Sequence, residues 1–204
     1  MRQASSRRPE RGYQKGEARR QLILNAAKTI LIKSGYHNLS VRRVAAKAGV
    51  SVGNLQYYFP TKRALTDAML DEVIEQYLVE FENLRQEGPP EEQFKNIIRL
   101  IFTDLQDPQT TVFFPEIWSL ANHQSGVTEQ VDAMYARYRS VLSDLVTAIN
   151  PDLSPERARQ LAVFFSSSIE GHTMFVGHGK PMADELDAQV DMAIDALLHL
   201  IHKG

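Results

Sequence analysis

The sequence predicts an all-helical protein, because its apolar residues recur at steps of three and four along nearly every segment. No stretch of useful length alternates apolar and polar residues at a period of two, as half-buried strands do. The glycines and prolines mostly fall between the periodic segments, at intervals that suit helices. We therefore expect a small three-helix head followed by a larger helical body, with about nine helices in all.

The three helices of the head carry clear end signals. The first covers residues 17–34 and ends at Gly35, which suits a left-handed helix cap. Ser40 is a favourable N-cap for a second helix over residues 41–48, and Ser51 for a third over residues 52–58. The residues expected to form the core of the head are Val44, Ala45, Val50, Leu55, Phe59 and Leu65.

A long fourth helix is expected from the N-cap Thr61 to about Gln86, where Gly88 and two prolines stop it. Further breakers divide the rest of the body into five helices. Their expected ranges are 91–106, 109–123, 126–149, 154–176 and 185–202. The chain is thus divided into a flexible basic tail over 1–15, the head over 16–62 and the body over 63–204.

The composition excludes several classes of protein. The chain has no cysteine, which rules out cysteine-ligated zinc, thiol catalysis and disulfides, and fits a reducing compartment. Residues 1–13 are basic and lack the apolar segment of a secretion signal, and no apolar run reaches membrane-spanning length. We therefore expect a cytoplasmic protein that has no contact with a membrane.

The net charge of −2 hides a strong division between the two ends of the chain. Residues 1–63 carry 14 Lys and Arg against 2 acidic residues, a net charge of +12, whereas residues 64–204 carry 9 against 23, a net charge of −14. A basic segment gains affinity for a polyanion by releasing counterions, and an acidic segment is repelled. The alternative is a solvated basic surface without a partner.

Two short helices joined by a glycine-containing turn, set in this basic segment, predict a helix-turn-helix whose second short helix enters a DNA major groove. The residues that carry the pattern are Leu39-Ser40, Val44-Ala45, Ala48-Gly49-Val50-Ser51, Gly53, Leu55, Tyr58-Phe59-Pro60 and Lys62 to Leu65. In these residues the chain resembles the TetR family of repressors. The resemblance covers residues 20–70 in detail, and the body only in length, helix count and helix order.

The chain departs from the family pattern at two positions. Gln56 stands where family members usually carry tyrosine, and Arg63 where they carry an acidic residue. A glutamine amide matches the N6 and N7 edge of adenine, so Gln56 is expected to contact a base; the alternative is a contact with phosphate alone.

The resemblance implies a DNA-binding role for a connected set of residues. Arg42 is expected at a base edge or a nearby phosphate, and Tyr57, Tyr58 and Lys62 at phosphates. Basic residues such as Arg43 and Lys47, and Arg7, Arg8, Arg11, Lys15, Arg19 and Arg20 of the N-terminal segment, add unspecific attraction. The full set of DNA-binding candidates is Ser40, Val41, Arg42, Arg43, Ser51, Val52, Gly53, Asn54, Gln56, Tyr57, Tyr58 and Lys62.

One such head contacts only a few base pairs, so the body is expected to form a homodimer that binds a palindromic operator. The last two helices are the candidates, because each has an apolar face; the alternative is that these faces only pack inward. The interface residues expected are Leu161, Phe165, Ile169, His172, Leu186, Val190, Ile194, Leu197 and Ile201.

Aromatic and polar residues gathered in the body predict a cavity for a small, largely apolar effector. The residues expected to line it are Phe102, Phe113, Phe114, Trp118, Asn122, Tyr135, Tyr138, Phe164, Ser167, Glu170 and Met174. The resemblance implies that the effector shifts the fourth helix and releases the repressor from DNA. No cofactor and no metal are expected, since the sequence has no pair of histidines at a four-residue spacing beside a carboxylate base.

Three other functions remain open at this point. The first is a regulator of the same family that activates transcription or has no small-molecule effector. The second is an enzyme, although the sequence has no phosphate-binding glycine loop, nucleophile elbow or paired-carboxylate motif. The third is an adaptor that uses the head to bind proteins.

Overall fold

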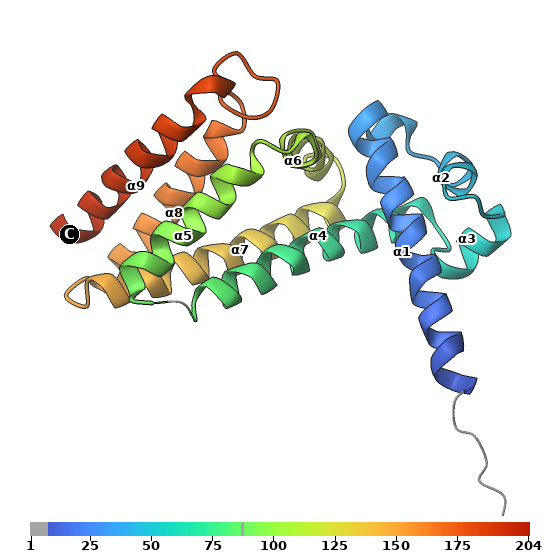
Figure 1. The fold of residues 1–204 in the computed structure, drawn as a ribbon, viewed down its shortest axis with the longest axis horizontal. Coiled ribbons are helices and arrows are strands. Elements are labelled where there is room, and N and C mark those ends of the chain that lie inside the picture. Colours follow the sequence, from blue (N-terminus) through green and yellow to red (C-terminus); the bar gives the residue numbers. More distant parts are fainter. Residues whose placement is uncertain (1–7, 87) are drawn as a thin grey trace, which may run out of the picture. The chain divides into compact units, whose positions relative to one another are not determined.

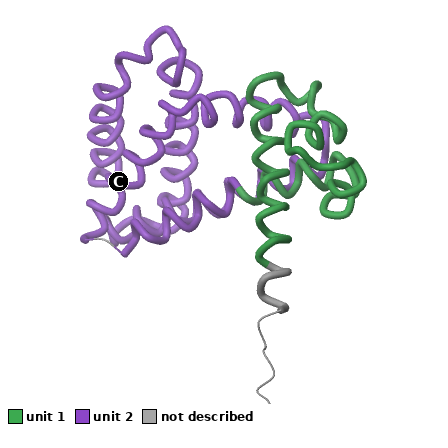
Figure 2. The backbone as a smooth tube through the Cα atoms, turned by 45° about the vertical axis from the view of Figure 1, so that its right-hand side comes forward, with its two compact units in different colours: residues 1–72 green, residues 73–204 purple. Residues whose placement is uncertain are grey.

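A computed structural model describes residues 8–86 and 88–204 of the chain. The described residues contain nine α-helices and two short 3-10 helices, and no β-strand (Figure 1). The all-helical prediction is confirmed, and the helices follow in the expected order. The chain divides into two compact units, Met1–Glu72 and Val73–Gly204 (Figure 2).

The helices of the first unit end where the sequence predicts. α1 spans Arg8–Ser34, α2 Val41–Lys47 and α3 Val52–Tyr58, with a 3-10 turn, η1, at Tyr36–Asn38. Gly35 connects α1 to η1 with a φ of 74°, a backbone conformation that favours glycine.

α1 begins at Arg8 rather than at residue 17, so residues 8–15 of the expected flexible tail are helical. The early start is compatible with Pro9, because proline is tolerated in the first turn of a helix, where the missing N–H has no helical acceptor. Residues 1–7 of the expected tail, Arg7 among them, lie outside the described residues, as do the side chains of Arg8 and Arg11.

The predicted core of the head is confirmed, with one exception. Val44, Ala45, Leu55, Phe59 and Leu65 are all buried, while Val50 is half-buried. α1 contributes further large core residues, which are Ile23, Leu24, Ile30 and Leu31.

α4 (Lys62–Leu84) contributes to both units, since the division at Glu72 falls inside this helix. The expected division after residue 62 lies ten residues earlier. Thr61 Oγ1 accepts a hydrogen bond of 3.0 Å from the Ala64 amide, which confirms Thr61 as the N-cap. Glu72 forms an ion pair with Lys28 of α1, so the first part of α4 is held in the first unit.

The other helices of the second unit lie within four residues of the predicted bounds. They are α5 (Pro90–Asp104), α6 (Pro108–Ala121), α7 (Ser125–Ile149), α8 (Pro155–His172) and α9 (Leu186–Lys203), with a 3-10 turn, η2, at Ala183–Glu185. α7 packs against α5, α6 and α8, and α9 packs against α5 and α8 (Figure 1). No helix in the described part of the chain is both long and apolar enough to cross a membrane.

α8 ends four residues earlier than predicted, because the chain leaves the helix to reach α5 and α6. The His178 amide donates to the Leu105 carbonyl oxygen at 2.8 Å and lies 3.1 Å from Thr111 Oγ1. These contacts anchor the loop between α8 and α9 to the body of the unit.

The residues predicted for the dimer interface prove to be mostly core residues of a single chain. At most 4% of the surface of each of seven of them is exposed: Leu161, Phe165, Ile169, Leu186, Ile194, Leu197 and Ile201. Val190 and His172 are half-buried, and the His172 ring lies 4.8 Å from the ring of Phe102. The physical reason is that each helix turns its most continuous apolar stripe toward the core of its own unit.

Candidate DNA-binding surface and ligand cavity

Two serine caps fix the turn between α2 and α3. Ser40 Oγ accepts from the Arg43 amide at 3.3 Å, and Ser51 Oγ accepts from the Asn54 amide at 3.1 Å. Between them, Gly49 has a φ of 64°, and the Val50 amide donates to the Ala45 carbonyl oxygen at 3.0 Å. Each serine thus caps one amide at the start of its helix, and the turn is held by hydrogen bonds among neighbouring residues.

α3 presents nearly its whole circumference to solvent. Leu55 is fully buried and anchors the helix, whereas Val52 is 38% and Tyr57 80% exposed. Gly53, Asn54 and Gln56 are also exposed. An exposed helix with one buried anchor presents its side chains to a partner, as a groove-binding helix must.

The other predicted DNA-binding residues surround this helix with different degrees of exposure. Arg42, Arg43 and Ser51 are exposed. Ser40, Val41, Tyr58 and Lys62 are half-buried. The structure therefore places the predicted set on one unit, with α3 at its most exposed part.

Two of the predicted cations already have partners within the head. Lys62 Nζ donates to the Tyr36 carbonyl oxygen at 3.0 Å and lies 3.7 Å from the centre of the Tyr36 ring. The Arg43 guanidinium donates to Asn38 Oδ1 at 2.9 Å. Both side chains are held in place, which reduces the side-chain entropy lost on binding a phosphate.

The basic residues of α1 differ among themselves. Lys15 and Arg19 are exposed. Arg20 lies with its guanidinium carbon 5.7 Å from the centre of the Phe59 ring and also pairs with Glu17 at 3.5 Å. Arg20 therefore covers an edge of the core, and its role is partly structural.

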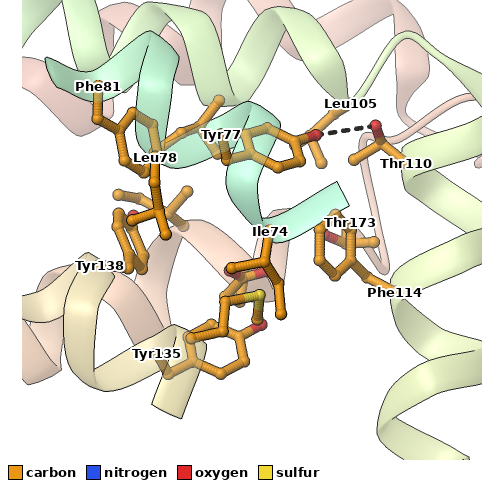
Figure 3. Close-up of a pocket in the computed structure, with 14 residues that line it drawn as sticks. Ile74, Tyr77, Leu78, Phe81, Leu105, Thr110, Phe114, Tyr135, Tyr138 and Thr173 are labelled. Carbon is orange, nitrogen blue, oxygen red and sulfur yellow. Dashed lines mark hydrogen bonds between the residues drawn. The ribbon is translucent and has the colours of Figure 1, made fainter. Parts of the chain in front are cut away.

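The second unit contains a cavity that encloses about 600 Å³ of empty space, counting its opening to solvent. Its residues come from α4, α5, α6, α7 and α8 and from the segments that follow α5 and α8 (Figure 3). Most are aromatic or aliphatic: Ile74, Tyr77, Leu78, Phe81, Ile101, Leu105, Phe114, Met134, Tyr135, Tyr138 and Ile169. The polar residues are Thr110, Thr173 and Glu170.

The aromatic rings of the cavity pack against one another. Phe81 stacks on Tyr138 with ring centres 5.6 Å apart, and Tyr77 lies 5.8 Å from Phe114. The Tyr77 hydroxyl forms a hydrogen bond of 3.3 Å with Thr110 Oγ1 (Figure 3). Such ring contacts hold the wall of the cavity in one arrangement.

Glu170 is the one carboxylate among the residues that line this cavity. Burial raises the pKa of Glu170 to about 7, and a hydrogen bond from Tyr135 opposes that rise. Burial also raises the pKa of Tyr138, and the charge of Glu170 raises it further. The Tyr138 hydroxyl is buried and has no hydrogen-bond partner among the described residues.

An open groove adjoins the cavity, and Tyr135 and Glu170 line both. The groove is otherwise lined by Trp118, Arg139, Ser166, Ser167, Gly171 and Met174. Trp118 Nε1 donates a hydrogen bond of 2.9 Å to the Tyr135 hydroxyl, which fixes that ring between the two spaces. Glu170 thus borders both the cavity and the groove.

Comparison with protein families decides the identity of both units. Residues 23–69 match the family described as bacterial regulatory proteins, tetR family, and residues 90–199 match the BetI-type transcriptional repressor, C-terminal. The chain belongs to the TetR family. The resemblance inferred from the helix-turn-helix residues is thereby confirmed, and the family consists of regulators rather than enzymes.

Individual TetR-family relatives match different portions of the chain. The RutR regulator of Escherichia coli K12 is 35% identical over 98 residues, which are 48% of this chain and 46% of RutR, so the match spans about half of that relative. The BetI regulator of Escherichia coli is 24% identical over 181 residues, which are 85% of this chain and 89% of BetI.

Solved structures of TetR regulators share the fold. One from Haloarcula marismortui has a TM-score of 0.75 at 18% identity and covers 92% of this chain and 98% of that chain. FadR of Bacillus subtilis, solved in complex with stearoyl-CoA, has a TM-score of 0.66 at 19% identity and covers 87% and 96%.

The predicted effector residues of this TetR-family body separate into three groups. Phe114, Tyr135, Tyr138 and Glu170 line the cavity. Trp118, Ser167 and Met174 line the adjoining groove. The remaining four lie outside both sets: Phe102 and Phe113 are buried core residues, and Asn122 and Phe164 are exposed.

The prediction missed the contribution of α4. Ile74, Tyr77, Leu78 and Phe81 line the cavity, although none of them was among the predicted effector residues. The available signal was the pair of aromatic residues one helical turn apart, Tyr77 and Phe81, which α4 turns toward the same space. Ile169, predicted for the dimer interface, also lines the cavity.

Proposed function

We propose that the protein is a ligand-responsive transcriptional regulator that binds a palindromic operator as a homodimer. The observation that carries this proposal is α3, an exposed seven-residue helix held by one buried leucine and two serine caps. It belongs to a segment with a net charge of +12, which attracts the phosphate backbone. The side chains of Arg42 and Gln56 are the proposed contacts to base edges.

Dimerisation is typical of the family, and it supplies the second head that specific binding requires. Because the predicted interface residues are buried, we assign the dimer surface to the opposite faces of α8 and α9. The exposed apolar residues there and in the loop between them are Val163, Phe164, Met174, Phe175, Met182 and Met192. Exposed apolar residues gathered in this way are typical of protein interfaces.

The cavity is the proposed effector site. Its lining is mostly apolar with a few polar groups, which is the usual composition of a small-molecule site. α4 carries four cavity residues and, two residues before the first of them, Glu72, which pairs with Lys28 of α1. A ligand that favours one position of α4 would change the energy of the head, provided that its affinity differs between the two states.

Selection from a random duplex library with the purified full chain tests the DNA-binding function. We expect one enriched palindromic sequence, and an affinity for random DNA that falls steeply as the salt concentration rises. Two half-sites about 34 Å apart, or a multiple of that spacing, are expected for a dimer. Absence of binding to any duplex at low salt would contradict the proposal.

A further inference from the structure

Glu170 lies in the wall of the cavity, and no cation of the described residues forms an ion pair with it. Three phenols respond to its charge: Tyr135 and Tyr138 from α7 and Tyr77 from α4, whose pKa values it raises. Its own pKa responds to burial and to the Tyr135 hydrogen bond, and no positive group within the described residues lowers it. A buried carboxylate in such surroundings requires either a proton or a cationic partner.

We propose that the cavity binds a protonated primary or secondary amine on an apolar skeleton, with its N–H groups directed at the Glu170 carboxylate and the Tyr138 hydroxyl oxygen. The inference rests on the proposed function only in taking this cavity as the effector site. It names the chemical class of that effector.

The aromatic lining favours a positively charged ligand. Tyr77, Phe81, Phe114, Tyr135 and Tyr138 all contribute rings to the wall, and the face of an aromatic ring attracts a cation. An ammonium group beside Glu170 also gains a charge-assisted hydrogen bond. A ligand that carries a carboxylate or phosphate in this position would meet Glu170 instead, and like charges at close range repel.

The hydrogen-bonding capacity of the wall favours an amine that retains N–H groups over a quaternary ammonium ion. The buried Tyr138 hydroxyl has no partner among the described residues, and a buried polar group without a partner is costly. An ammonium N–H satisfies the Tyr138 oxygen as well as Glu170. A quaternary ammonium ion has no N–H and therefore leaves the Tyr138 hydroxyl without a hydrogen-bond partner.

The rest of the cavity suits an aliphatic or aromatic skeleton. Ile74, Leu78, Ile101, Met134 and Ile169 complete the lining with apolar side chains. The groove shared by Tyr135 and Glu170 gives the charged end a route from solvent. An apolar lining of this kind suits a short alkyl chain.

Calorimetric titration of the full chain with four hexyl compounds tests the proposal, because they differ only in the head group. The compounds are hexylamine, hexyltrimethylammonium, hexanol and hexanoate. Hexylamine is expected to bind most tightly and hexanoate most weakly. Trp118 is the only tryptophan of the chain and borders the cavity through Tyr135, so its fluorescence gives a second readout.

Two variants assign the effect to the named groups. Glu170→Gln keeps the shape of the side chain and is expected to weaken hexylamine by roughly tenfold or more, while hexanol is unchanged. Tyr138→Phe removes one hydroxyl from the core and is expected to weaken hexylamine by roughly threefold to tenfold without affecting hexyltrimethylammonium. Glu129→Gln, an exposed carboxylate on α7, is the matched control and should have no effect.

Equal or tighter binding of hexanol, hexanoate or hexyltrimethylammonium overturns the proposal, and so does an absence of hexylamine binding at millimolar concentration. If Glu170→Gln does not fold, Tyr138→Phe decides. The affinity for duplex DNA is measured separately on the wild-type protein: loss of that activity with retained amine binding rejects the regulator function and leaves the cavity assignment intact, and the reverse result rejects only the amine.

Discussion

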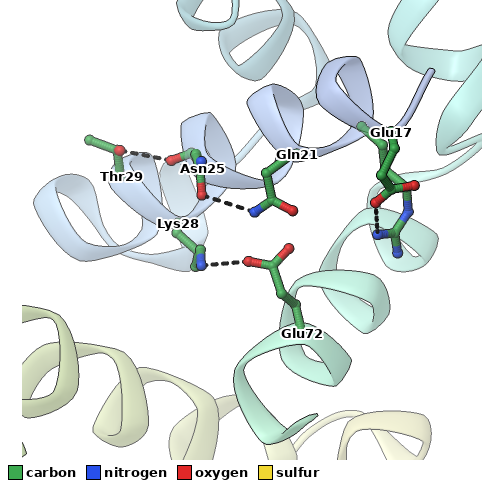
Figure 4. Close-up of polar contacts among 7 residues, drawn as sticks. Glu17, Gln21, Asn25, Lys28, Thr29 and Glu72 are labelled. Atoms are coloured by element: carbon green, nitrogen blue, oxygen red, sulfur yellow. Dashed lines mark hydrogen bonds and ion pairs between the residues drawn. The ribbon is translucent and has the colours of Figure 1, made fainter. Parts of the chain in front are cut away.

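Lys28 Nζ lies 2.7 Å from Glu72 Oε1, and both side chains are largely buried, with 15% and 12% of their surfaces exposed (Figure 4). The second carboxylate oxygen of Glu72 is buried and has no hydrogen-bond partner among the described residues. This ion pair joins α1 to α4 within the first unit. Glu72 lies two residues before Ile74, the first residue of α4 that lines the cavity.

Removing one partner of this pair is expected to destabilise the head. Lys28→Met leaves the Glu72 carboxylate buried without a cation and should lower the free energy of unfolding by about 1–3 kcal/mol. The double variant Lys28→Met, Glu72→Leu removes both charges and should recover most of the loss. Urea denaturation measures both. A double variant less stable than Lys28→Met alone would show that the pair contributes through its packing and not its charge.

Specific and unspecific DNA contacts can be separated by mutation. Arg42→Ala and Gln56→Ala are each expected to cost about 1–3 kcal/mol of binding free energy at the selected operator, with little loss on random DNA. Fluorescence anisotropy with both duplexes measures the difference. Arg137→Ala, an exposed arginine of α7, is the control. Equal losses on the two duplexes would assign Arg42 and Gln56 to phosphates.

Lys62 is expected to act on stability and on unspecific affinity together. Lys62→Ala removes one of two donors to the Tyr36 carbonyl oxygen, the other being the Leu39 amide at 3.1 Å, and should cost about 0.5–1.5 kcal/mol of folding stability. It should also weaken operator and random DNA alike and reduce the salt dependence of binding by about one ion. Lys47→Ala, exposed on α2, should leave stability unchanged. A selective loss at the operator would make Lys62 a base contact.

The helices of the head were predictable because their signals are local. Ser40, Gly49, Ser51 and Thr61 mark helix ends through caps and a turn that involve only neighbouring residues. The residues that line the cavity were not predictable from local signals, since the lining depends on how five helices pack together. Phe113 and Phe114 are adjacent in sequence, yet only Phe114 faces the cavity, and periodicity alone does not distinguish a core face from a cavity wall.

The interface residues were misassigned to the core face of the helices for a related reason. α8 has apolar residues on two sides: Phe165 is fully buried, and its neighbour Phe164 is 53% exposed. The sequence pattern identifies both as apolar but does not specify which side faces the core of the chain. Burial decides that point. On α8 it moves the expected interface from the face that carries Phe165 to the face that carries Phe164.

Phe164 is therefore the residue whose substitution should disrupt the dimer. Phe164→Glu places a charge in the proposed interface and is expected to shift the protein toward monomer in sedimentation velocity. Val79→Glu is the matched control, because Val79 is 49% exposed on α4 and lies outside the proposed surface. Two monomeric variants would point to general destabilisation, and two dimeric ones would place the interface elsewhere.

The stability of the protein should depend on pH through Glu170. Its pKa is about 7 in the folded chain against an ordinary value of 4.5. Below pH 4.5 the carboxyl is protonated in both states, and the neutral form is stable in the cavity wall. Between pH 4.5 and about 7 the folded protein holds a proton that the unfolded chain has released, so the free energy of unfolding falls as the pH rises through this range. Above about pH 7 the carboxyl is ionised in both states and the loss is complete.

Glu170→Gln isolates this contribution, because glutamine does not titrate while the other ionisable groups remain. The variant should match the wild type near pH 4.5 and exceed its free energy of unfolding by roughly 1–3 kcal/mol above pH 7, in the absence of ligand. Urea denaturation across this pH range measures the difference. The groups around Glu170 are Tyr135, Tyr138 and Tyr77, with Arg139 beside the Tyr135 ring. Burial raises the pKa of each of the three tyrosines, so they stay neutral over this range. A constant difference between the two proteins would mean that Glu170 stays ionised in the cavity wall throughout.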